Sequence, residues 1–496
     1  MKKSLAVTLV ALFVLAVSFA MVPKKANAIP AFAEKYHFSC AVCHTVFPNL
    51  NPFGRAFWRN GFRLPGTNGT PADATQISNG LALPNPWPIP IVLEAQVFYQ
   101  HLTNENTNIK MGGISSNGQT DMFNYKTNLV IGGADKLYTP FVKSLSFYAN
   151  YGENTPGGDI SANQVWASLD GIGSGFGLAP HLLNLKLGNV TTASPYFYRQ
   201  SPFSGGFTEG PVMNGQGLNV GYDGEGGNLI HAQNPGIALY GTPGYHLWYK
   251  VTMTNDAGPA ANTPATGNRI LGYNSKGYAN TVGQVSNAME YSYQLKEYLP
   301  TSFGQLEFGY YGASIAEPIT ADNLVTDIQN TWTDGIQVNG VDLDLANDIY
   351  ELGLTYMEQH DSNPYDNTSI DGHTTNGYND FEVYGRYLFP TLLGHGAMLV
   401  ADFSTYSWQH KQTEEEFNEN PYVSNETDAS SSCSNADLYQ SGTYASSNGC
   451  INEGVKDAFD IFGDVNLAYN AHLYAGYIFT NKSQDDMFRT GLYFAF

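Results

Sequence analysis

The last ten residues of the chain, 487–496, read MFRTGLYFAF, and their side chains alternate in character. One set of alternate positions is mainly apolar and comprises Phe488, Leu492, Phe494 and Phe496. The intervening set comprises Arg489, Gly491 and Tyr493. Successive side chains of a β-strand point to opposite faces, so this spacing predicts a strand with one apolar face and one mainly polar face.

The same two-residue period recurs along most of the chain. In residues 303–311, for example, Leu306, Phe308 and Tyr310 alternate with Glu307 and other polar or small residues. We expect sixteen such strands, near residues 91–102, 121–132, 143–151, 162–171, 182–191, 235–240, 245–254, 282–297, 303–313, 332–343, 347–359, 377–389, 396–407, 457–468, 471–481 and 485–496. Strands of about ten residues with two unlike faces suit a barrel that crosses a bilayer around a polar lumen.

The predicted fold is therefore mainly β: a 16-stranded transmembrane antiparallel β-barrel with a small N-terminal α-helical domain. Short turns, such as residues 241–244 and 299–301, should lie on the periplasmic side, where barrel turns are short. Long segments, such as residues 192–234 and 408–456, should face outward, which places both termini in the periplasm. Phe496 resembles the C-terminal assembly signal of bacterial outer-membrane barrels. The expected localisation is the outer membrane with extracellular loops.

Composition agrees with such a barrel. Only 14% of the 496 residues are charged and 14% are aromatic, with 52 Gly and 33 Tyr, whereas a soluble globular protein is nearer about 25% charged. The formal net charge is −21; the first 28 residues hold four lysines and no acids, so removing them gives −25. This balance argues against a nucleic-acid partner, since phosphates require Lys and Arg. It suits cationic partners, although many exported proteins are acidic simply for solubility.

The chain divides into four predicted parts. Residues 1–28 read as a signal peptide, with a basic start, an apolar run and a small-x-small cleavage site, although an uncleaved membrane anchor is the alternative. Residues 29–80 form a small domain with a helical pattern at 51–62. Residues 81–90 form a linker whose four prolines disfavour helix and ladder hydrogen bonds. Residues 91–496 form the barrel.

The small domain contains the motif Cys40-Ala41-Val42-Cys43-His44. Two cysteines separated by two residues and followed at once by histidine match the attachment of haem c. Cys40 and Cys43 would form thioethers with the haem, and His44 would bind its iron as the proximal ligand. A redox dithiol is the alternative, but no second Cys-x-x-Cys motif is present to complete a zinc site. The sequence therefore predicts one covalent haem c.

The second axial ligand of that haem is not determined by the sequence. Between residues 29 and 90 there is no methionine, and the only histidine besides His44 is His37. His101, Met111 and Met122 come from the first predicted strands and loop and could serve if the domain lies in or against the barrel. An open or water-bound site is a further alternative.

Other candidate sites are less specific. Seven acids are expected to face the lumen, where carboxylates would attract a hard cation: Glu94, Glu307, Glu351, Glu382, Asp402, Asp460 and Asp464. Barrel interiors are polar in any case, so these acids alone define no iron site. A looser group in one outer segment comprises His360, His373, Asp361, Asp366 and Asp371.

Two smaller expectations concern cysteine and aromatic residues. Cys433 and Cys450 lie in one polar segment of a chain that we expect to be exported, so they are predicted to form a disulfide. Aromatic residues near strand ends, such as Trp248 and Tyr311, are expected to belong to the girdles at the membrane interfaces.

The stretch from Cys40 to Thr45, together with Pro52-Phe53-Gly54-Arg55-x-Phe57 and Gly61-Phe62, resembles the fused outer-membrane monohaem cytochrome–porins of iron-oxidising bacteria. The local motif covers about 25 residues, and the order of leader, haem domain, proline linker and barrel covers the whole chain. The resemblance implies an Fe(II)-oxidising electron-transfer protein, of the iron:cytochrome c oxidoreductase type. Its acceptor would be a periplasmic cytochrome or another electron carrier.

Three other functions are weighed against this expectation. The protein could be a haem-plugged solute porin, or a conduit that exports electrons to extracellular acceptors. A soluble periplasmic haem enzyme built on a β-propeller is disfavoured, because propeller blades do not need an apolar face on every strand. The substrate rests on resemblance alone, since fold does not determine function.

Overall fold

The computed structural model of the chain describes residues 42–46, 49–62, 75–78, 81–83, 91–102, 110–111, 114–115, 121–137, 139–153, 161–193, 233–255, 289–323, 328–361, 376–390, 392, 396–410, 457–468, 471–480 and 487–495. Within these residues, no helix is long and apolar enough to cross a membrane.

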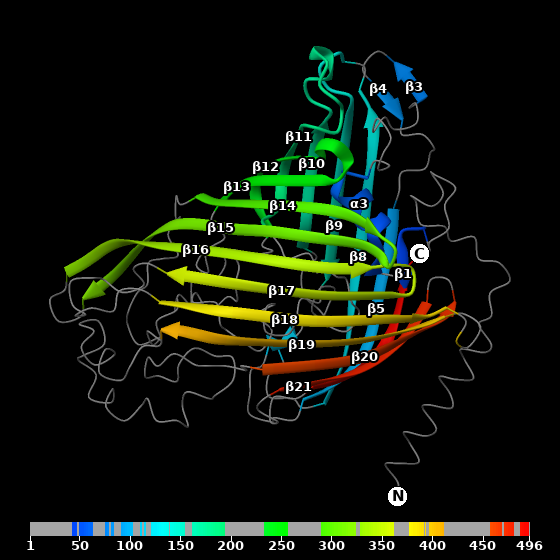
Figure 1. Ribbon diagram of the computed structural model, residues 1–496, viewed down its shortest axis with the longest axis vertical. Helices are drawn as coiled ribbons and strands as arrows, with labels where there is room; N and C mark the ends of the chain where they lie inside the picture. Colours follow the sequence, from blue (N-terminus) through cyan, green and yellow to red (C-terminus); the bar gives the residue numbers. More distant parts are fainter. Residues whose placement is uncertain are drawn as a thin grey trace, which may run out of the picture.

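Sixteen antiparallel strands form a closed barrel (Figure 1). They are β5 (Ile91–Leu102), β8 (Asp121–Lys136), β9 (Ser144–Glu153), β10 (Ser161–Asp170), β11 (Asn184–Thr191), β12 (Gln233–Gly241), β13 (Leu247–Asn255), β14 (Met289–Thr301), β15 (Gly304–Asn323), β16 (Ile328–Ala346), β17 (Tyr350–Asp361), β18 (Asn376–Phe389), β19 (Ala397–His410), β20 (Asp457–Ala468), β21 (Ala471–Thr480) and β22 (Met487–Ala495). Each strand pairs with its neighbours in this order, and β22 pairs with β5 to close the ring. Closure leaves no sheet edge unpaired.

The structure confirms the mainly β, 16-stranded antiparallel barrel and all sixteen predicted strands, whereas the small N-terminal haem domain stays a prediction. The largest differences are at strand ends. β14 begins at Met289, seven residues after the expected start, and β15 and β16 are 20 and 19 residues long. These two strands pair over their full length, from Gln305 with Ala346 to Asn323 with Ile328, so they form one long hairpin (Figure 1).

Alternation separates an apolar outer surface from a polar interior. Outward side chains such as Phe308 and Leu352 are 50% and 54% exposed, whereas their inward neighbours Glu307 and Glu351 are 2% and 0% exposed. An apolar outer band around a polar interior is the surface that a transmembrane barrel needs.

The two aromatic residues expected in the interfacial girdles face inward instead. Trp248 on β13 is 5% exposed, and Tyr311 on β15 is 0% exposed. The prediction was wrong because their strand positions have the inward parity. Tyr310, the residue before Tyr311 on β15, has the outward parity and is 42% exposed.

The barrel has two unlike ends. At one end the strands are joined by short turns, which include residues 302–303, 347–349 and 469–470. At the other end the connections are long, as in residues 192–232 and 411–456. This grouping confirms that the short turns share one end. The turn between β10 and β11 contains the short 3-10 helix η2 (Ser174–Phe176), and the turn between β12 and β13 contains η3 (Pro243–Tyr245).

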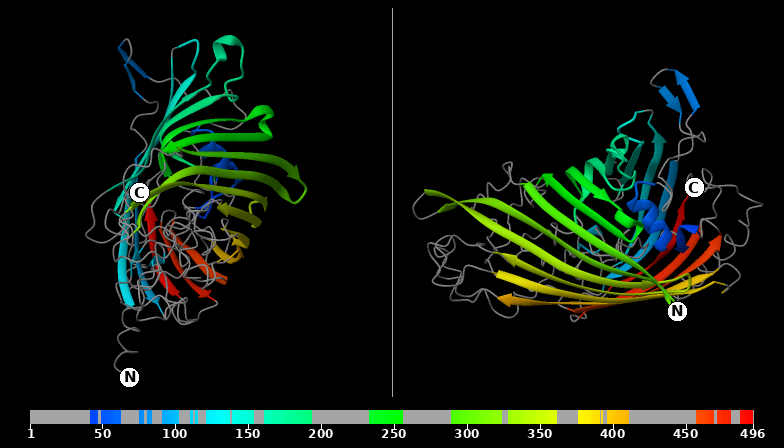
Figure 2. Two further views of the ribbon diagram at one scale, coloured as in Figure 1. Left: turned by 90° about the vertical axis from the view of Figure 1, so that its left-hand side faces the viewer. Right: turned by 45° about the horizontal axis from the view of Figure 1, so that its top comes forward.

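Among the described residues, the N-terminal part of the chain adds a helix and short strands. Strands β1 (His44–Val46) and β2 (Asn49–Leu50) pair, and helix α3 (Pro52–Arg59) follows them. Figure 2 shows α3 within the mouth of the barrel. The hairpin β3 (Thr75–Ser78) and β4 (Leu81–Leu83) takes up the first residues of the expected linker, whose prolines lie outside the described residues.

Small hairpin strands also lie between β5 and β8. They are β6 (Lys110–Met111) and β7 (Ile114–Ser115).

Candidate functional site

The cysteine motif is fixed to the start of helix α3 by backbone contacts. The Asn51 backbone N–H donates to the carbonyl oxygen of Cys43 at 2.9 Å, and the Asn51 side-chain amide donates to the carbonyl of Val42 at 3.0 Å. The Asn51 side-chain oxygen accepts from the backbone N–H of Gly54 at 2.9 Å, which caps the helix. Pro52 occupies the first helical turn, where its missing N–H costs nothing. One asparagine therefore joins the motif to the helix.

Gly54 is required by the close approach of α3 to Cys43. A Cβ atom placed on Gly54 would lie 2.1 Å from the Cys43 carbonyl oxygen. Glycine inside a helix costs roughly 0.5–1 kcal/mol relative to alanine, so the contact with Cys43 explains a residue that helix propensity disfavours. Cys43 itself is half-buried.

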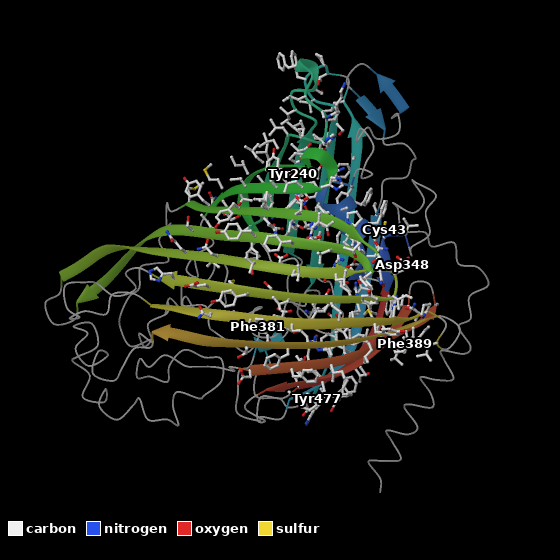
Figure 3. The ribbon with its side chains drawn as sticks, viewed as in Figure 1. Cys43, Tyr240, Asp348, Phe381, Phe389 and Tyr477 are labelled. Carbon is white, nitrogen blue, oxygen red and sulfur yellow. The ribbon has the colours of Figure 1, made fainter. Side chains whose placement is uncertain are left out.

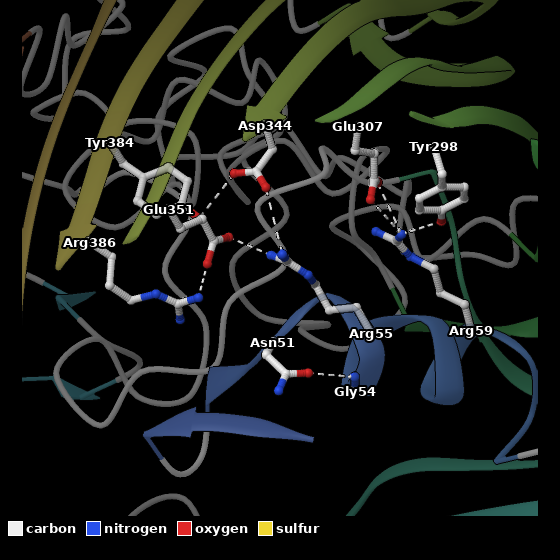
Figure 4. A network of polar contacts seen from close by, with 10 residues as sticks. All are labelled: Asn51, Gly54, Arg55, Arg59, Tyr298, Glu307, Asp344, Glu351, Tyr384 and Arg386. Atoms are coloured by element: carbon white, nitrogen blue, oxygen red, sulfur yellow. Dashed lines mark hydrogen bonds and ion pairs between the residues drawn. The ribbon is translucent and has the colours of Figure 1, made fainter. Parts of the chain in front are cut away.

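Arg55 joins the helix to one wall of the barrel (Figure 4). Its guanidinium forms ion pairs with Glu351 on β17 and with Asp344 on β16, the latter at 3.6 Å. Glu351 also pairs with Arg386 on β18, and Asp344 accepts from the Tyr384 hydroxyl at 3.4 Å. These charged side chains are at most 5% exposed. Removing one partner of such a buried pair leaves an uncompensated charge.

Arg59, one helical turn later, contacts the same wall nearer to β14. Its guanidinium lies 3.0 Å from Glu307 on β15 and donates to the Tyr298 hydroxyl at 2.5 Å (Figure 4). The guanidinium also lies 5.6 Å from the centre of the Trp248 ring, within cation–π range. Residues four apart share one helix face, so Arg55 and Arg59 direct that face of α3 toward β13–β18.

The opposite side of the helix segment packs on aromatic residues of β9 and β10. Phe62 stacks on Trp166 with ring centres 5.8 Å apart and an interplanar angle of 8°, and it lies 5.7 Å from Tyr148. Phe57 meets Phe62 edge-on at 5.8 Å. Gly61 turns the chain between these rings with φ of +66°, and a Cβ there would lie 2.7 Å from a serine hydroxyl of β9. The segment thus bridges two walls of the barrel.

A cavity of about 770 Å³ lies between α3 and the short turns of the barrel. It extends from Val42, next to Cys43, to the turn residues His181, Thr242 and Asn347 and to Gly304, the first residue of β15. Trp248, Tyr298 and Phe53 also line it. Figure 3 shows Cys43 at the same end of the barrel as Asp348, which is a further lining residue. Cofactor sites are typically cavities of about 300–1,000 Å³ with mainly apolar lining and a few polar groups.

This cavity fits the haem that the sequence predicts. Its volume lies in the range of cofactor sites, it borders Val42 within the motif, and its lining combines aromatic rings with the cation Arg59 and an imidazole. Cys40 lies outside the described residues, and His44 is described as part of β1 without its side chain. Attachment through Cys40, Cys43 and His44 therefore stays a prediction.

The lumen acids of the sequence analysis occupy the inward positions that were expected of them. Glu382, Asp402, Asp460 and Asp464 are each at most 3% exposed. Asp402 on β19 lies directly opposite Asp460 on β20, and Glu382 is on the neighbouring strand β18. Within the described residues, no group of three or more His, Cys, Asp or Glu side chains is arranged to hold a metal ion.

The sequence candidates for the second axial ligand lie elsewhere. His101 lies near the end of β5 that is at the long-connection end of the barrel, where it pairs with Asp121. Met122 pairs with Gln100 at the same level, and Met111 lies on β6 between β5 and β8. His37 lies outside the described residues. The structure thus brings neither His101 nor Met122 to the mouth that holds α3.

The remaining candidates fall at the long-connection end or outside the described residues. His360 is exposed near the end of β17, and Asp361 is the last residue of that strand. His373, Asp366, Asp371, Cys433 and Cys450 lie outside the described residues.

Several residues of the site were not found by sequence reasoning. His181, Arg59, Tyr298 and Asp344 carry no local motif, and Arg55 is separated by 296 residues from Glu351. Of these residues, only Arg55 belongs to the motif that carries the family resemblance. The motif does not indicate which residues Arg55 pairs with.

Comparison with known proteins identifies no family. No family model and no curated protein matches the chain. Solved structures with a similar strand arrangement include the loop L8 deletion mutant of OmpT, an outer membrane protein of Vibrio cholerae, at 10% identity and a TM-score of 0.45 over 82% of this chain and 99% of that one. Others are OprB of Pseudomonas putida, at 8% identity and 0.49 over 82% and 94%, and a mutant of the Rh. blastica porin, at 11% identity and 0.40 over 82% and 100%.

Proposed function

We propose that the chain is an outer-membrane cytochrome–porin that oxidises extracellular Fe(II) and passes the electron through a covalent haem c to a periplasmic acceptor. The main support is the position of the Cys43 segment, which is held inside a closed barrel, beside a cavity of about 770 Å³, by the ion pairs of Arg55 and Arg59. A segment that only linked two domains would not need this anchoring to the lumen wall.

The chain supplies the attachment, the position and the enclosure of the cofactor. Cys40 and Cys43 would hold the haem, and His44 would bind its iron. Bound haem c accepts one electron and returns it. Asn51 and Gly54 fix the motif against α3, and the aromatic contacts of Phe62 fix α3 against the barrel. These contacts keep the site at the short-turn end, which in this proposal faces the periplasm.

The location of the cavity also determines how Fe(II) reaches the site. β18 has 14 residues, so it extends roughly 45 Å at about 3.3 Å per residue. A donor held at the far end would be separated from the cavity by most of this length. Fe(II) therefore enters the lumen, where Asp402 and Asp460 and the neighbouring Glu382 raise the local concentration of the cation.

The test uses the full-length protein purified from outer membranes with its haem attached. Under anoxia, Fe(II) should convert the optical spectrum from the oxidised to the reduced form, with one Fe(II) oxidised for each haem reduced. A protein without covalent haem, or one that stays oxidised with Fe(II) while a small neutral reductant reduces it, contradicts the proposal. Solute flux through liposomes without Fe(II)-dependent reduction would favour the solute porin instead.

A paired variant tests the role of the lumen acids. Replacing Asp402 and Asp460 by Asn should slow haem reduction several-fold at low Fe(II), while reduction by a small neutral donor stays unchanged. Glu358→Gln is the matched control, because Glu358 is exposed on the outward face of β17. Equal rates for the double variant and the control at every Fe(II) concentration would remove the acids from the mechanism.

A further inference from the structure

His181 lies in the turn between β10 and β11, at the end of the barrel that holds α3. Its side chain is 9% exposed, and it lines the same cavity as Val42 and Asn51. The sequence gives no reason to single out this histidine, which lies far from His44 in the chain. The cavity nevertheless borders both His181 and Val42 of the cysteine motif.

The backbone that carries His181 is fixed by the neighbouring turn. Its carbonyl oxygen accepts from the backbone N–H of Thr242 at 2.8 Å, and the next carbonyl, of Leu182, accepts from the Tyr249 hydroxyl at 2.7 Å. The Leu182 N–H donates to the Ala179 carbonyl at 3.0 Å. These contacts fix the backbone from which the His181 side chain lines the cavity.

The other side chains that line the cavity do not compete with His181. Proteins ligate haem iron through His, Met, Cys or Tyr. Among the described lining residues, His181 is the only one of the first three types, and Tyr298 is the only tyrosine. The Tyr298 hydroxyl already accepts from Arg59 at 2.5 Å.

Two candidates drawn from the sequence, His101 and Met122, are too distant along their strands. Ile91 marks the short-turn end of β5, because it pairs with Ile131 on β8 and β8 runs on to Lys136 and the short turn that follows. His101 follows Ile91 by ten residues, or about 33 Å of strand. Met122 is at the level of Gln100, next to His101. His181, in contrast, lies at the short-turn end and lines the cavity.

We infer that His181 is the second axial ligand of the haem that Cys40, Cys43 and His44 hold. The inference rests on the proposed function, because it presupposes the haem. It assigns two imidazoles to the iron, one from the N-terminal segment and one from a turn of the barrel. Ligation would then join the two parts of the chain through the cofactor itself.

The test compares ferric optical and EPR spectra of the full-length haem protein and three variants. The unsubstituted protein should show the low-spin spectrum of two axial imidazoles. His181→Ala should lose this spectrum and become high-spin, and added imidazole should restore it. His181→Met should remain low-spin, with the absorption of a histidine–methionine haem and a higher reduction potential. His246→Ala is the matched control, since His246 is exposed in the adjacent turn, and its spectrum should not change.

Two results would overturn the inference while leaving the proposed function intact. One is a high-spin spectrum in the unsubstituted protein, and the other is an unchanged low-spin spectrum in both His181 variants. Each still allows reduction of the haem by Fe(II). Absence of covalent haem from the unsubstituted protein would instead overturn both proposals. Because His181→Met retains a ligating side chain, it decides the question if His181→Ala does not fold.

Discussion

The wall of the lumen built by β15–β18 and the wall built by β5 and β19–β22 differ in what their inward side chains contact. The first wall presents charges, and Glu307, Asp344 and Glu351 pair with the two arginines of α3. The second wall carries the lumen acids Asp402, Asp460 and Asp464. It also contains a cluster of apolar and aromatic side chains that pack on one another: Phe98, Met398, Val400, Phe462, Tyr474, Ile478, Met487 and Tyr493.

This difference shows that the interior of one barrel contains two kinds of packing. Charged groups fix the helix in one orientation, because a guanidinium out of register would remain buried without a carboxylate. The apolar cluster stabilises its wall through burial, which depends little on direction. The contrast predicts that substitutions on the first wall, whose acids pair with α3, affect α3 far more than substitutions on the second wall.

The largest effect is expected for Glu351→Gln. The change keeps the shape of the side chain but removes the charge that pairs with both Arg55 and Arg386. Breaking a buried pair costs roughly 3–5 kcal/mol, so the backbone amides of α3 should exchange hydrogen much faster while the barrel stays folded. Glu358→Gln, on the outward face of the same strand, should leave exchange unchanged. Unaltered protection of α3 in the Glu351 variant would show that the ion pairs do not hold the helix.

A somewhat smaller effect is expected for Phe62→Ala. Phe62 is 5% exposed and stacks on Trp166, and truncating a buried phenylalanine costs about 3 kcal/mol. The emission of Trp166 should change, and the exchange of the α3 amides should increase. Phe308→Ala truncates a phenylalanine that faces outward and is 50% exposed, so it should alter neither measurement. Equal effects of the two substitutions on α3 would contradict the bridging role of the segment.

The smallest effect is expected on the second wall. Arg489 lies 4.7 Å from the Phe98 ring and donates to the Gln100 side chain at 2.6 Å. Replacing both members of a buried hydrogen-bonded pair by apolar groups is often nearly neutral, so Arg489→Met with Gln100→Leu should change stability by less than about 1 kcal/mol. Arg489→Met alone leaves Gln100 without this donor and should cost about 1–3 kcal/mol. Urea titration of barrel unfolding measures the stability changes of the single and the double variant. A double variant that is less stable than Arg489→Met alone would show that Arg489 makes stabilising contacts besides its hydrogen bond to Gln100.

The barrel could be predicted from the sequence because its main signal is local. Alternation in residues such as Leu306, Glu307 and Phe308 reports the two faces of a strand directly, and the same parity placed Asp402 and Asp460 in the lumen. The inward positions of Trp248 and Tyr311 were missed because residue type, rather than parity, was used to place them.

The site could be predicted only in part. The motif from Cys40 to His44 and the helix at residues 51–62 are local features, and the structure describes that helix as α3. The pairing of Arg55 with Glu351 depends on strand register almost 300 residues away. His181 depends on which turns meet around the cavity. Neither relation leaves a pattern in one sequence.

The pairing of β22 with β5 has a consequence for the order of assembly. The ring closes only when the last strand meets the first, from Met487 opposite Leu102 to Ala495 opposite Glu94. Helix α3 precedes β5 in the chain, yet its charged partners belong to β15–β18. Contacts between such distant parts of a chain form late during folding. The helix is therefore synthesised well before its binding wall exists, and the barrel encloses it as the strands close.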